Sequence, residues 1–235
     1  MSIEVLHLSK SFGSSQAIQD LSFDLKKGQI TGFLGPNGAG KSTTLKILMG
    51  LEIPCFGEAR ILGMDVQKQD LHIKKQIGYL AENNPLYPEM YIKEFLTFIG
   101  KIHGINASNL PKRITEVIEL VGLEREQKKK IKEISKGYQQ RVGLAQAILH
   151  DPKILILDEP TSGLDPNQME EIRTLIVSLK KDKTILFSSH LLGEVNAICD
   201  HVLLIDKGHL KANCSIEEAK NYPGGLNAFF KDKTN

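Results

Sequence analysis

The sequence has no tryptophan, only three cysteines and almost no net charge. Its formal net charge at pH 7 is +2, so bulk charge gives no argument for a nucleic-acid partner. Cys55, Cys199 and Cys214 are far apart and lack metal-ligand spacing, which is typical of a reducing compartment. A disulfide-rich secreted scaffold is therefore excluded, and we expect no nucleic acid among the partners.

Long apolar runs are also missing. No uncharged apolar stretch approaches the roughly 18–20 residues that span a bilayer. The N-terminus, Met1 to Lys10, alternates apolar and polar residues and has no signal-peptide core. We therefore expect a protein that stays in the cytoplasm. Its 235 residues are enough for one large domain with a sizeable core.

Short alternating segments in the first 80 residues predict strands. Two of them, Ile3 to Leu8 and Ile18 to Leu25, are separated by a turn and are expected to pair in antiparallel fashion. Ile30 to Leu34 is an apolar strand that leads into a glycine-rich loop and then a helix, Lys41 to Met49. Further strands are expected at Gly57 to Leu62 and Ile77 to Leu80.

The middle of the chain changes to helical periodicity, and the last third alternates. Helices are expected at Tyr91 to Ile102 and Leu110 to Val121, within a helical subdomain at about 85–150. Apolar strands then alternate with amphipathic segments, which indicates a mostly parallel sheet covered on both faces. The strands are Ile154 to Leu157, Thr184 to Ser188 and Val202 to Ile205, and the helices are Asn167 to Lys180 and Leu191 to Ala197.

The glycine-rich loop carries the first chemistry. It matches the pattern G-x-x-x-x-G-K-[ST] and reads Gly35, Pro36, Asn37, Gly38, Ala39, Gly40, Lys41, Ser42, followed by Thr43. Its position between a strand and a helix is the context in which backbone N–H groups and a helix N-terminus bind phosphate. We expect Lys41 to reach the β- and γ-phosphates of a nucleotide and Ser42 to ligate Mg²⁺.

A second element supports the first. The apolar strand at Ile154 to Leu157 ends in Asp158 and Glu159. In isolation two such acids could simply cap the next helix. Beside a phosphate loop, Asp158 is expected to hold Mg²⁺ through water, and Glu159 to act as general base toward the attacking water.

A third motif separates the classes of phosphate-loop proteins. The run Ile134 to Arg141, with Ser135, Lys136 and Gly137 at its start, opens a helix and resembles the signature of the ABC cassette, whose usual form is L-S-G-G-Q followed by Q-R. A serine, a glycine and a helix N-terminus form another anion site. Two phosphate sites on one chain suggest that two chains enclose each ATP.

The resemblance to ABC cassettes covers nearly the whole chain and implies further roles. Phe12 matches the aromatic residue that stacks on adenine, and His190 matches the switch histidine at the γ-phosphate. The run Ser162 to Asp165 resembles the D-loop. Each has a structural alternative: Phe12 as a core aromatic, Asp165 as a helix cap, and His190 as one of seven histidines.

Two positions depart from the usual family pattern. Glu82 stands where most cassettes carry the Q-loop glutamine, and this carboxylate could ligate Mg²⁺ but would repel the γ-phosphate. In the signature, Lys136 replaces a glycine and Tyr138 a glutamine; Lys136 either meets phosphate across an interface or points into solvent. These departures resemble ABC-2-type exporters, and most of all the ATPase associated with bacterial gliding motility.

The resemblance therefore implies the α/β fold of ABC ATPases: a phosphate-loop core with a mostly parallel sheet, an N-terminal antiparallel subdomain and an inserted helical subdomain. Residues 1–225 are expected to form the ATPase domain and 226–235 a C-terminal tail. The end of the chain from Asn221 to Asn235 is expected to fray. The implied function is ATP hydrolysis with Mg²⁺, in a homodimer or heterodimer of cassettes that drives export through a separate membrane permease. The chain would then sit peripherally on the inner face of the membrane.

Three alternatives stay open at this point. A soluble, non-transport ABC ATPase usually carries two cassettes or a long coiled coil, and neither is present. Many sugar-importer cassettes append a regulatory domain, whereas about thirty residues follow the last predicted strand. A degenerate binding module would be expected to lack some of Lys41, Asp158, Glu159 and His190.

Overall fold

The computed structural model describes residues 1–68 and 71–234. The chain divides into two compact units, residues 1–74 with 180–235 and residues 75–179. The phosphate loop and the switch histidine belong to the first unit. The acidic strand end and the signature belong to the second, so each unit holds half of the predicted chemistry.

The first unit contains an antiparallel sheet in the order β2-β1-β4-β5. β1 (Ile3–Phe12) pairs with β2 (Ser15–Leu25) and with β4 (Phe56–Ile61), and β5 (Met64–Asp65) completes the edge. Ile3 and Val5 alternate with polar residues and are fully buried, and a register shift between Val5 and Leu8 buries Leu8 as well, so these segments form half-buried strands. The predicted antiparallel subdomain is confirmed.

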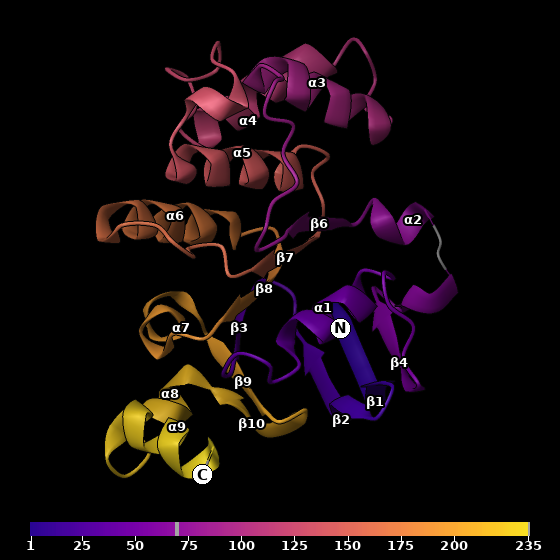
Figure 1. Cartoon of the computed structure of the whole chain (residues 1–235), viewed down its shortest axis with the longest axis vertical. Coiled ribbons are helices and arrows are strands. Elements are labelled where there is room, and N and C mark those ends of the chain that lie inside the picture. Colours follow the sequence, from indigo (N-terminus) through magenta and orange to yellow (C-terminus); the bar gives the residue numbers. More distant parts are fainter. Residues whose placement is uncertain (69–70, 235) are drawn as a thin grey trace. The chain divides into compact units, whose positions relative to one another are not determined.

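A second sheet of this unit carries the phosphate loop (Figure 1). β3 (Ile30–Leu34) lies between β8 (Thr184–Ser189) and β9 (His201–Asp206) and is parallel to both, while β10 (His209–Ser215) is antiparallel to β9. Every residue of β3 and β8 is buried, as expected for strands covered on both faces. α1 (Lys41–Leu48) follows β3, and α7 (Leu192–Ile198) packs on β3 and β8.

The second unit combines two parallel strands with helices (Figure 1). β6 (Ile77–Leu80) pairs with β7 (Ile154–Asp158), with Leu80 opposite Leu157. α3 (Ile92–Ile102), α4 (Leu110–Leu120) and α5 (Lys136–Ile148) contact one another, and α5 also contacts β6. α6 (Pro166–Leu179) follows β7. Because 3.6-residue periodicity buries one face of each helix, the expected helices agree with the structure within about two residues.

Some elements escaped sequence analysis because they are short or weakly periodic. These are β5, β10, the turn η1 (Val66–Lys68), α2 (Leu71–Lys74), η2 (Ile131–Glu133) and α8 (Ile216–Lys220). The segment expected to fray differs too: α9 (Gly225–Thr234) is a helix in which Phe229 is buried and meets Tyr222 edge to face. Asn235 lies outside the described residues.

Across residues 1–68 and 71–234, no helix combines the length and the apolar character that a membrane span needs.

Candidate functional site

The phosphate loop is held tightly at its glycines. Gly40, the N-cap of α1, has φ +107°, and a Cβ there would lie 2.5 Å from the carbonyl oxygen of Ala17. Only glycine satisfies both conditions. The Gly208 N–H donates to the Ala39 carbonyl at 3.0 Å, which fixes the loop to the β9–β10 turn.

Lys41 places a cation inside this loop. Its buried ammonium donates to the carbonyls of Gly35 at 2.6 Å and Pro36 at 3.2 Å. The N-terminus of α1 has no side-chain cap and no acidic residue in its first turn, and Ser42 is exposed there. The loop thus presents a lysine, a hydroxyl and the positive end of a helix dipole, the arrangement that binds phosphate.

The predicted switch histidine lies beside the loop within the same unit. Leu34 pairs with Ser189 across β3 and β8, and the Gly35 N–H donates to the Ser189 carbonyl. His190 follows directly and is exposed. The Ser189 hydroxyl bonds the buried Glu194 carboxylate and accepts the Leu191 N–H, so both neighbours of His190 are held in place.

Phe12 ends β1 at the hairpin that leads to β2. Its ring is 48% exposed, which rules out the alternative of a core aromatic. The Lys10 ammonium lies 4.8 Å from the ring centroid. A half-exposed ring on a strand end can stack on a base.

In the second unit, β7 delivers two buried carboxylates. Asp158 is its last residue, and Glu159 follows with φ +49°. A left-handed glutamate is strained, and such strain gathers at functional sites.

Tyr79 and Glu82 belong to the same edge. β6 and β7 run parallel, so Tyr79 near the end of β6 lies beside the end of β7. Burial, and then the charges of Asp158 and Glu82, raises the pKa of Tyr79 to about 12. The three side chains are therefore electrostatic neighbours. Glu82 itself is exposed.

The signature residues begin α5. Ser135 is the N-cap, and its hydroxyl accepts the Tyr138 N–H at 3.4 Å. A Cβ on Gly137 would lie 2.7 Å from the Gln168 side chain, so α5 starts in close contact with α6. Lys136 is exposed.

Lys136 extends toward the D-loop rather than straight into solvent. A Cβ on Gly163 would collide with its ammonium. Asp165 accepts the Gln168 N–H at 3.0 Å, so the D-loop aspartate does cap a helix, as its structural alternative held. The signature and the D-loop thus form one surface of the second unit.

The structure brings the predicted residues together in two groups. Gly35 to Thr43, His190 and Phe12 lie in the first unit, and Glu82, Asp158, Glu159 and the signature lie in the second. Sequence analysis missed Tyr79 and Lys10. The signal for Lys10 was its position two residues before Phe12, since alternate residues of a strand share a face.

Comparison with known proteins gives the family. A family model described as ABC transporter matches residues 18–162. The bacitracin transport ATP-binding protein BcrA of Bacillus licheniformis is 42% identical over 220 residues, covering 93% of this chain and 71% of that protein. The linearmycin resistance ATP-binding protein LnrL of Bacillus subtilis is 36% identical over 211 residues, covering 89% and 68% respectively.

Solved structures agree with the fold. One described as the ATP-binding subunit of an ABC transporter has a TM-score of 0.89 at 28% identity and covers both chains completely. A dimeric bacterial ABC transporter cassette has a TM-score of 0.82 at 24% identity, covering 91% of this chain and 98% of its own, and shows the fold alone. With its phosphate loop and acidic strand end, the chain belongs to the ABC transporter family as an ATP-binding subunit and is an ATPase.

Proposed function

We propose that the chain is the motor of an exporter and hydrolyses ATP between two cassettes to drive a separate membrane permease. The observation that carries it is the division of the chemistry between two surfaces. The first unit contains the phosphate loop. The second unit contains the signature but no phosphate loop. Relatives named for bacitracin transport and linearmycin resistance support the exporter assignment.

Each residue has a role in this proposal. Gly35 to Thr43 bind the phosphates, and Lys41 neutralises the charge that develops on them. Phe12 stacks on adenine. Glu159 accepts a proton from the attacking water, and His190 contacts the γ-phosphate. Ser135, Lys136 and Gly137 close the site from the other chain.

Magnesium fits the donor set. Ser42, Glu82 and Asp158 supply the oxygen ligands that Mg²⁺ prefers, and Mg²⁺ binds through one or two carboxylates together with substrate phosphates and water. Among the residues that the structure describes, no group of three or more acidic, histidine or cysteine side chains could hold a metal ion. When bound, Mg²⁺ supplies charge neutralisation at the phosphates.

The proposal extends to domain and location. Residues 1–225 form the ATPase domain with a helical subdomain at about 85–150, and 226–235 follow it. The permease holds the cassette on the inner face of the cell membrane. The cassettes pair as a homodimer or a heterodimer. We also propose that the chain is similar to ABC-2-type exporter cassettes and to the gliding-motility ATPase.

A mixing experiment tests the two-cassette site. Lys41→Ala removes the cation of the phosphate loop, and Ser135→Arg blocks the surface that closes the partner's site. Each variant alone should be inactive, whereas the mixture contains one intact phosphate loop facing one intact signature. ATP hydrolysis that appears only on mixing is expected. Full wild-type turnover in a verified monomer would overturn the two-cassette model.

A further inference from the structure

Lys10 is a largely buried lysine with three partners. Its side chain is 13% exposed and its ammonium donates to the carbonyl oxygen of Ile53 at 2.7 Å. It also forms an ion pair with Glu52 at 3.1 Å and lies 4.8 Å from the centroid of the Phe12 ring. A buried ammonium is stable only when such partners replace its water. Lys10 is therefore held by specific contacts with the protein, unlike a solvated surface lysine.

The segment that receives Lys10 connects two parts of the nucleotide site. The N–H groups of Leu51 and Glu52 donate to the carbonyl of Lys46 in the last turn of α1, at 2.9 and 3.3 Å. The Cys55 N–H donates to the Ser9 carbonyl in β1 at 2.8 Å. The loop from Leu51 to Cys55 is thus bonded to the helix that starts at the phosphate loop and to the strand that ends at Phe12.

The Lys10 side chain connects the loop from Leu51 to Cys55 with Phe12 at the end of β1. The contact joins residues 43 positions apart in the sequence, so no local preference of β1 creates it. Because the ammonium covers part of the Phe12 ring, it limits how that ring can turn. A cation over one face of an aromatic ring also withdraws electron density from the other face, which favours stacking of a second π system.

We propose that Lys10 is a positioning residue for the nucleotide base: it holds the Phe12 ring in register with the phosphate loop so that adenine and triphosphate bind together. The inference rests on the proposed stacking of adenine on Phe12. Lys10 contacts neither the phosphates nor the attacking water in this scheme. Its loss should therefore weaken binding of the base and leave the chemical step unchanged.

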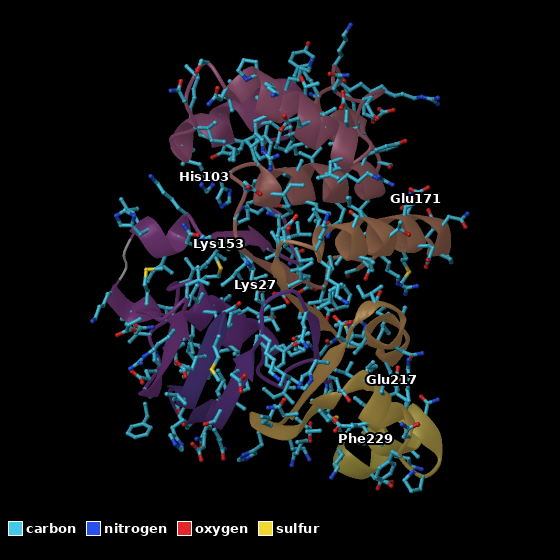
Figure 2. The ribbon with its side chains drawn as sticks, turned by 180° about the vertical axis from the view of Figure 1, so that it is seen from behind. Lys27, His103, Lys153, Glu171, Glu217 and Phe229 are labelled. Atoms are coloured by element: carbon cyan, nitrogen blue, oxygen red, sulfur yellow. The ribbon has the colours of Figure 1, made fainter. Side chains whose placement is uncertain are left out.

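The first test compares Lys10→Met with Lys27→Met. Lys27 is an exposed lysine in the turn after β2 (Figure 2), so its substitution removes the same charge from the same unit. Lys10→Met should raise the KM and the Kd for ATP by about three- to tenfold, while kcat stays within about twofold of wild type. Lys27→Met should change neither constant.

Two further measurements separate positioning from general damage to the fold. Lys10→Arg keeps a cation over the ring and should recover most of the ATP affinity, whereas Lys10→Gln keeps only a hydrogen bond to Ile53 and should not. Inorganic tripolyphosphate has no base, so its affinity should be the same in wild type and Lys10→Met. A parallel loss of tripolyphosphate binding would overturn the proposal.

A double-mutant cycle gives the decisive comparison. In a Phe12→Ala background the ring is gone, and Lys10→Met should then change the Kd for ATP by less than about twofold. An undiminished effect in that background, or an unchanged ATP affinity in Lys10→Met alone, refutes the positioning role. Neither result touches the proposed function, which fails instead if the wild-type chain does not bind or hydrolyse ATP.

Discussion

Two glycines in the phosphate loop allow a prediction with a built-in control. Gly38 has φ +79° and open space for 4 Å around the point where a Cβ would lie, whereas Gly40 has φ +107° and would bring a Cβ within 2.5 Å of the Ala17 carbonyl oxygen. Both lie in one loop, two residues apart. Alanine at Gly38 tests the backbone conformation alone, and alanine at Gly40 adds a collision with backbone.

The magnitudes follow from that difference. A left-handed conformation costs a residue with a Cβ about 1–2 kcal/mol, which is the expected loss for Gly38→Ala. Overpacking adds about 1–3 kcal/mol, so Gly40→Ala should lose about 2–5 kcal/mol of unfolding free energy. The smaller unfolded-state entropy of alanine acts equally on both variants and cancels in the comparison. The larger loss is a substantial part of a total stability of about 5–15 kcal/mol.

Urea unfolding of both variants, with ATP affinity measured in parallel, is the assay. Gly40→Ala should unfold at clearly lower urea than Gly38→Ala and should bind ATP more weakly, because it displaces the start of α1. Equal midpoints for the two variants would refute the argument, since the contact with Ala17 is what distinguishes them.

Three shorter predictions concern the second unit. Glu159→Gln should still bind ATP, but its rate of phosphate release should fall by about 10²–10⁴-fold. Glu217→Gln, on the exposed first turn of α8, is the control and should keep full phosphate release. Near-normal turnover in Glu159→Gln would show that Glu159 is not the base. Glu82→Gln should shift the Mg²⁺ concentration that half-saturates hydrolysis, and an unshifted titration contradicts metal binding there. Burial, with Lys75 adding to it, lowers the pKa of His103 (labelled in Figure 2), so the unfolded chain binds more protons below about pH 6.5. Urea titrations at decreasing pH should therefore show stability falling less steeply in His103→Gln than in wild type, and parallel curves would contradict this.

Local sequence was sufficient for the strand, loop and helix around Lys41. An apolar run of five residues, glycines that accept positive φ and a following helical pattern each act over a few residues, so the phosphate loop was predictable with its boundaries. The same holds for Asp158 and Glu159 at the end of a buried strand. In both places the residues predicted to act on the nucleotide follow one another in the sequence.

Contacts between distant segments could not be obtained in that way. The neighbourhood of Tyr79, Glu82 and Asp158 depends on the pairing of β6 with β7, which are separated by the whole helical subdomain. Weak periodicity hid β10, and the segment of α9 was expected to be a frayed tail, whereas the packing of Phe229 makes it a helix. Short elements gain their stability from tertiary burial and not from local preference.

Lys10 and Lys136 show the difference between what local sequence determines and what tertiary contacts decide. The sequence by itself determined their types and their places beside Phe12 and Ser135, because strand and helix periodicity are local. It left open whether either ammonium meets solvent or protein. Only the tertiary structure decided that Lys10 lies against Ile53 and Phe12 and that Lys136 reaches Gly163. A long flexible side chain takes its direction from whatever partners the fold brings within reach, and those partners are distant in the sequence.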